Sequence, residues 1–191
     1  MPSSTRQRLI ESAVRRYYRD GFGNVGLDQL LADVGISKTA FYKHFECKED
    51  LVLAALEMKN CWLQDTLREM VRERGGASPV GQIRALLDVV DLIIDADEYQ
   101  GCIFVNVALE FPLPHEPAHV AAAQHKYAIE EIVQDLASRA GATDPRQMAQ
   151  ELCLIMEGAY VTRQVTGDKH SIDVARRVAD LVIAAKFDSC K

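Results

Sequence analysis

The stretch Gly35–Phe45, GISKTAFYKHF, carries the strongest structural signal in the sequence. Gly35 suits a chain reversal that needs left-handed backbone, and Ser37 stands where a helix N-cap is expected. In the short helix that follows, the 100° step between residues places Phe41 and Phe45 on one side. Basic and aromatic side chains are left on the other side. A helix that only packs into a core needs no such face, whereas a helix that enters a DNA groove does.

The segments before this stretch complete a helix-turn-helix pattern. Ser4 predicts the start of a first helix that runs to about Asp20, and Gly21 ends it. A second short helix is predicted over about residues 27–34. A helix, a turn that contains Gly and a second short helix form the helix-turn-helix arrangement. We therefore expect a three-helix head over residues 1–47.

The outer face of the third helix, predicted over about residues 38–45, is the candidate DNA contact. Thr39 and Lys43 lie almost opposite the two Phe residues, so we expect them to reach base edges in a major groove. Lys38 and Tyr42 flank them on the same outer face. Three residues, Tyr42, His44 and Lys48, are better placed for the backbone phosphates, which fix register rather than sequence. A solvated basic face on an ordinary packing helix is the alternative interpretation.

The rest of the chain also has helical periodicity, with no convincing strand alternation. Six more helices are predicted, at about 48–73, 79–96, 102–110, 118–140, 145–166 and 171–187. The fold class is therefore all-α, with about nine helices. Residues 48–191 are expected to form a second, larger helical domain.

Charge and composition narrow the function classes. The chain has 191 residues and a net charge of −6, but residues 1–50 carry eight basic and seven acidic side chains, against 14 and 21 in the remainder. Five scattered cysteines without a CxxC spacing indicate neither disulfides nor a metal site. No nucleophile–base pattern or phosphate-binding glycine loop is present, so we expect no enzyme and no cofactor. Without an apolar signal or a bilayer-length apolar run, a cytoplasmic protein with no membrane partner is expected.

The segments LDQLLADV and GISKTAFYKHFECKEDLV together resemble the DNA-binding domain of tetracycline-repressor-type (TetR/AcrR) transcriptional regulators, with Tyr42–Glu49 as the most specific part. The resemblance implies a homodimer that binds a palindromic double-stranded operator. It also implies a carboxy-terminal domain in which a small-molecule effector weakens DNA binding, as in a ligand-responsive repressor. A constitutive or architectural DNA-binding protein without an effector is the alternative.

The same resemblance suggests roles for residues of the second domain. The dimer interface is expected on the last two helices, through Met148, Leu152, Ile155, Ala159, Val174, Val178, Leu181 and Val182. A largely apolar effector pocket with a few polar anchors is expected to use Trp62, Phe104, Asn106, Glu110, Tyr127, Glu157 and Tyr160. Each of these residues also suits an ordinary structural position, with a neighbour satisfying any buried polar group.

Overall fold

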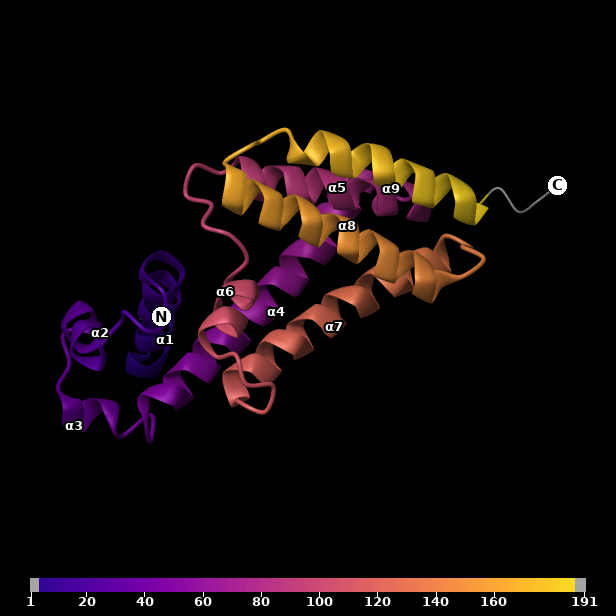
Figure 1. Ribbon diagram of the computed structural model, residues 1–191. Coiled ribbons are helices and arrows are strands. Elements are labelled where there is room, and N and C mark those ends of the chain that lie inside the picture. Colours follow the sequence, from indigo (N-terminus) through magenta and orange to yellow (C-terminus); the bar gives the residue numbers. More distant parts are fainter. Residues whose placement is uncertain (1–3, 188–191) are drawn as a thin grey trace. The chain divides into compact units, whose positions relative to one another are not determined.

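The computed structural model describes residues 4–187, and within that range the chain forms nine helices and no strand (Figure 1). The predicted all-α class is confirmed. The helices are α1 Thr5–Asp20, α2 Leu27–Val34, α3 Lys38–Phe41, α4 Lys48–Gly75, α5 Pro79–Asp95, α6 Ile103–Glu110, α7 Pro117–Arg139, α8 Pro145–Thr166 and α9 Ser171–Phe187.

The helices pack into two compact units. Unit 1 comprises α1–α3, the first part of α4, α6 and the first part of α7, that is, residues up to 62 together with 103–125. Unit 2 comprises the remainder, with α5, α8 and α9 complete. The expected boundary at residue 47 precedes α4, whereas this packing boundary lies inside α4 and α7. The head therefore shares a compact unit with α6.

Most helix ends follow the local signals. The Ser4 side chain accepts a hydrogen bond from the backbone N–H of Gln7, and Ser78 and Asp144 cap α5 and α8 in the same way. Such caps satisfy N–H groups that have no partner inside the helix. The observed bounds of these helices differ from the predicted ones by at most two residues.

The third helix is the exception. It was predicted to run to Phe45, but α3 ends at Phe41 and residues 42–44 form a turn. The N–H of His44 bonds to the carbonyl of Phe41, three residues earlier, which tightens the chain. The N–H of Phe45 still reaches the Phe41 carbonyl at 3.2 Å. The turn thus keeps both Phe side chains on the inner side.

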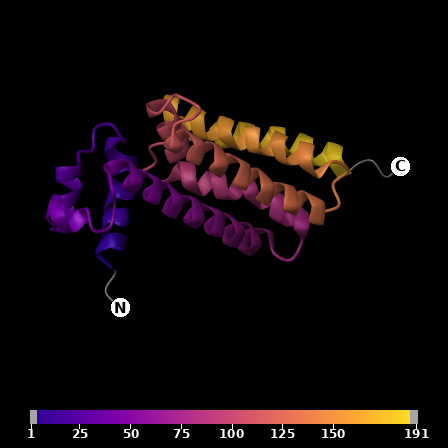
Figure 2. The same cartoon turned by 90° about the horizontal axis from the view of Figure 1, so that it is seen from below.

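Each unit has its own apolar core. In unit 2 one cluster joins α5, α8 and α9 with the later parts of α4 and α7. Both views show α8 and α9 alongside each other with α5 against them (Figures 1 and 2). In unit 1, Leu9, Leu30 and Phe41 are fully buried. Across residues 4–187 no helix combines the length and apolar character needed to cross a membrane.

Candidate nucleic-acid interface

Two buried aromatic rings hold α3 against the rest of the head. Phe41 is 0% exposed and Phe45 is 5% exposed, and their rings stack with centroids 5.5 Å apart. Gly35 adopts the left-handed conformation, with φ 73°, and its N–H closes the end of α2 on the carbonyls of Leu31 and Ala32. This turn sets the direction in which α3 leaves α2.

The opposite side of α3 and of the following turn faces outward. Thr39, Lys43 and His44 are exposed, and the Tyr42 side chain is 58% exposed with its ring edge-on to Phe41. A hydroxyl, an ammonium group, an imidazole and a phenol are thus presented together. These groups can donate to base edges or phosphate oxygens without any rearrangement of the core.

Lys38 is exposed as expected, but it has an acidic partner. Its Nζ lies 2.9 Å from Oδ1 of Asp28, which stands in the first turn of α2. The hydrogen bond to Asp28 and its charge raise the pKa of Lys38. Since both side chains are largely exposed, the pair is weak and DNA phosphates can compete for the ammonium group.

Lys48 was predicted to contact phosphate, and the structure places it differently. Its Nζ donates to the carbonyl oxygen of Phe22 at 3.2 Å, because the start of α4 lies beside the turn between α1 and α2. The side chain is half-buried there. Lys48 therefore acts as an internal link, and we leave it out of the candidate DNA-contact set.

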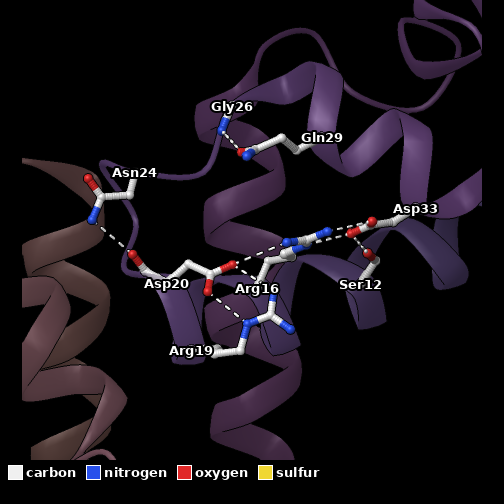
Figure 3. Close-up of polar contacts among 8 residues, drawn as sticks. All are labelled: Ser12, Arg16, Arg19, Asp20, Asn24, Gly26, Gln29 and Asp33. Carbon is white, nitrogen blue, oxygen red and sulfur yellow. Dashed lines mark hydrogen bonds and ion pairs between the residues drawn. The ribbon is translucent and has the colours of Figure 1, made fainter.

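A network of charged side chains fixes α1 against α2 (Figure 3). The Arg16 guanidinium donates to both carboxylate oxygens of Asp33 at 2.7 Å, and the Ser12 hydroxyl adds a third bond to Asp33. Asp20 accepts from Arg19 and from Arg16. Hydrogen bonds from Arg19 and then Arg16 lower the pKa of Asp20 to about 2, and those from Arg16 lower the pKa of Asp33. Both carboxylates are thus ionised at neutral pH.

The residues predicted for an effector pocket divide between the two units. Trp62, Phe104, Asn106 and Glu110 belong to unit 1, while Tyr127, Glu157 and Tyr160 belong to unit 2.

In unit 1, Phe104 is buried and stacks on His125 with centroids 3.7 Å apart. The indole of Trp62 is 54% exposed and lies under the Lys59 ammonium group. Asn106 is half-buried. The Glu110 carboxylate, expected as a ligand anchor, accepts hydrogen bonds from the backbone of Phe22 and Gly23 instead. Both oxygens of this carboxylate are thus occupied by backbone N–H groups of the head.

In unit 2, Glu157 lies in an ion pair that the sequence reasoning missed. Its carboxylate accepts from Lys126 Nζ, which also lies 3.5 Å from the Cys102 sulfur. Burial opposes the charge on Lys126, but the sulfur and carboxylate outweigh it and raise the lysine pKa. A signal for this pair was present in the sequence. Lys126 is the sole Lys or Arg between residues 117 and 138, and Glu157 is an acid in a largely apolar part of α8, so each needs a partner of opposite charge. Tyr127 is 67% exposed, and the Tyr160 carbonyl accepts from the Tyr99 hydroxyl at 3.0 Å.

The predicted dimer residues also separate into two sets. Met148, Leu152 and Ala159 are buried within the cluster that joins α5, α8 and α9, so their side chains are already packed in the chain's own core. Ile155 and Val182 are partly buried against the same cluster. The face of α8 that was expected to meet a partner chain therefore points into the core of unit 2. Val174, Val178 and Leu181 on α9 are exposed.

Three features of α3 define a helix-turn-helix DNA-binding head. Aromatic rings anchor the helix, the Gly35 turn joins it to α2, and its outer face is basic. Among residues 4–187, no group of three or more His, Cys, Asp or Glu side chains is placed to hold a metal ion.

The chain belongs to the tetR family of bacterial regulatory proteins. The family's DNA-binding domain matches residues 9–55, and the tetracyclin repressor-like C-terminal domain matches residues 79–179, about half of the chain. It is thus a DNA-binding transcriptional regulator and not an enzyme.

Individual relatives agree with this assignment. The HTH-type transcriptional regulator YjdC of Escherichia coli is 20% identical over 97% of this chain and 96% of its own. The HTH-type transcriptional repressor DhaR of Mycobacterium is 27% identical over 55% of this chain and 51% of its own. The crystal structure of SCO4454, a TetR-family transcriptional regulator from Streptomyces coelicolor, superposes with a TM-score of 0.83 at 26% identity, covering 95% of both chains.

Proposed function

We propose that this regulator is a repressor that binds a palindromic operator as a homodimer and is released by a small, largely apolar effector. The observation that carries the proposal is the anchored α3 with its exposed Thr39, Tyr42, Lys43 and His44. A single head of this kind contacts few phosphates, so specific binding favours two heads on two half-sites. Repression is supported by the similarity to DhaR, whose name describes a repressor.

The homodimer is supported by an apolar stripe on the outer side of α8 and α9. Its members are Leu154, Val161, Val165, Val174, Val178 and Leu181, which are all at least 41% exposed. Spacings of four and seven residues place them on one side of each helix. An exposed apolar patch of this kind marks an interaction site, and a second copy offers the same patch to it by two-fold symmetry.

A small effector is supported by the polar groups of unit 2. The half-buried Lys126–Glu157 pair lies beside Cys102 on helices that otherwise contribute apolar side chains to the core. A ligand that is mainly apolar and carries one polar group could replace one partner of this pair. An architectural protein without an effector is the second candidate, and it predicts DNA affinity that no small molecule changes.

The test begins with selection of bound duplexes from a random-sequence pool, followed by sequencing. We expect an enriched palindrome. Enrichment of no site, with salt-dependent binding to all duplexes, would support the architectural alternative. The selected duplex, labelled with a fluorophore, then reports on release by a library of aromatic and aliphatic small molecules.

The dimer is tested with a charge in the stripe. Sedimentation equilibrium of Leu181→Glu should give a monomer that has lost the palindrome-specific affinity. Leu92→Glu is the matched control, because Leu92 is 43% exposed on α5, outside the stripe. A Leu181→Glu protein that is still dimeric would exclude the stripe as the interface.

A further inference from the structure

The carboxylate of Glu110, at the end of α6, is bound to the turn between α1 and α2. Oε1 accepts from the N–H of Phe22 at 3.0 Å, and Oε2 accepts from the N–H of Gly23 at 2.6 Å. Both oxygens of one acid are therefore used on two consecutive backbone amides, 88 and 87 residues away in the sequence. Hydrogen bonds to an ionised acceptor are stronger than those between neutral groups.

Two glycines make room for this contact. A Cβ atom at Gly21 would lie 3.2 Å from Oε1 of Glu110, and a Cβ at Gly23 would lie 3.3 Å from Oε2. Both distances are tighter than nine in ten real Cβ contacts, so a side chain at either position would push the carboxylate away by a few tenths of an ångström. Gly21 also has a φ of 82°, which a residue with a side chain rarely adopts. The sequence Gly-Phe-Gly therefore forms a cradle into which the carboxylate fits.

Phe22, between the two glycines, has partners for its backbone N–H, its carbonyl and its ring. Its carbonyl accepts from Lys48 Nζ at 3.2 Å, while its N–H is held by Glu110. Its ring is 2% exposed, stacks on Tyr17 at 4.8 Å and meets the edge of Phe111 at 6.2 Å. The turn is thus fastened to α1, to α4 and to the end of α6, all within unit 1.

The turn is also the segment that leads into α2. Three residues separate Phe22 from the N-cap of α2 at Gly26, and α2 carries α3 through the Gly35 turn. A rotation of the head relative to α6 would have to break the two bonds to Glu110. The ring of Phe22 also meets Phe111, directly after α6, but that apolar contact has no hydrogen-bond direction. The contacts to Tyr17 and Lys48 come from α1 and from the residue that follows the head.

We propose that Glu110 is a positioning residue for DNA binding, which fixes the helix-turn-helix head on α6 and thereby sets the half-site spacing that the regulator accepts. The proposal rests on the dimeric operator binding proposed above. In a two-fold dimer, both recognition elements must match two half-sites at once, so a head of fixed orientation accepts one spacing. A head released from α6 accepts a wider range of half-site spacings.

The experiment compares two duplexes with full-length protein: the selected palindrome, and the same palindrome with one base pair added at its centre. The insertion moves one half-site by about 3.4 Å along the axis and about 35° around it. The measured quantity is the ratio of the two affinities. For Glu110→Ala we expect this ratio to fall by about tenfold, the range expected for lost hydrogen bonds to a charged group. Loss of stability alone would weaken both complexes equally and leave the ratio unchanged.

Three further measurements complete the test. Glu110→Gln keeps one acceptor oxygen and should give an intermediate ratio, which also serves if the alanine variant folds poorly. Glu131→Ala, which removes an exposed acid from α7, should leave the ratio at the wild-type value. Amide hydrogen exchange at Phe22 and Gly23 should become faster in both Glu110 variants and stay unchanged in Glu131→Ala.

The outcomes separate this inference from the proposed function. A wild-type ratio well above one, together with the same ratio in both Glu110 variants, would overturn the positioning role and leave dimeric binding intact. A wild-type protein that does not distinguish the two duplexes would also overturn the positioning role, because no spacing would then be set, whereas the proposed function fails separately if no palindrome is enriched.

Discussion

Phe41 and Tyr42 are adjacent aromatic residues that the structure assigns to opposite sides of the recognition element. Phe41 is 0% exposed and Tyr42 is 58% exposed. Replacement of each by Ala should therefore have opposite effects. Phe41→Ala should destabilise the head and Tyr42→Ala should weaken DNA binding.

The size of the first effect follows from burial. Removal of a fully buried ring costs about 3–5 kcal/mol, because apolar surface is lost and a cavity is left. The stacked contact with Phe45, at 5.5 Å, lies in the range where aromatic pairs add to burial. We therefore expect the free energy of unfolding of unit 1 to fall by about 4 kcal/mol. For the exposed Tyr42, a loss below about 1 kcal/mol is expected.

The assay is urea unfolding followed by circular dichroism at 222 nm, with operator affinity measured on the same preparations. Phe41→Ala should move an early part of the helical signal to lower urea while the core of unit 2 unfolds as before. Tyr42→Ala should leave the unfolding curve in place and weaken binding to all sequences, with a smaller salt dependence. Equal losses of stability in the two variants would refute the inward and outward assignment of α3.

Other substitutions and conditions test further parts of the head. Lys43→Ala should relax base preference at one operator position by about 1–3 kcal/mol, read from repeated duplex selection; an unchanged sequence preference would place Lys43 away from the bases. Lys48→Ala should lower the melting temperature without changing the salt dependence of DNA binding, since its Nζ bonds to Phe22. A salt slope reduced by about one would instead identify it as a phosphate contact. The carboxylates of Asp20 and Asp33 have lowered pKa values, so the stability they provide is present above their ordinary pKa near 3.8 and is lost as the pH falls through the lowered pKa of the folded state. Acid unfolding in this window should be shallower in Asp33→Asn, and a curve that matches the wild type would show that Arg16 contributes nothing through this acid.

The features of the head that were predictable from sequence are local ones. A serine cap at Ser37, a left-handed glycine at Gly35 and two Phe residues four apart each act over a few residues. Rules for caps, turns and helical periodicity describe such effects directly. The early end of α3 was missed, because the turn after Phe41 keeps the same inward face and leaves the hydrophobic pattern unchanged.

The roles of Glu110 and Lys48 depend on contacts that no local rule describes. Both side chains bond to Phe22, from positions 88 and 26 residues away. In the sequence, a glutamate at the end of an apolar helix suits a ligand site as well as a backbone contact. For α8, Met148 and Leu152 were predicted to lie in the dimer interface, whereas the structure buries them in the chain's own core; the choice between that core and a partner requires the packing of α5 and α9.

The apolar stripe on α8 and α9 has a consequence for how much of this protein a cell must make. If two chains must meet through Leu154, Val174 and Leu181 before the operator is held, occupancy depends on chain encounters as well as on DNA affinity. Where separate chains predominate, the concentration of the paired form rises with the square of the total, so halving synthesis lowers it about fourfold. The stripe would then make the regulated gene respond sharply to the expression level of its own regulator.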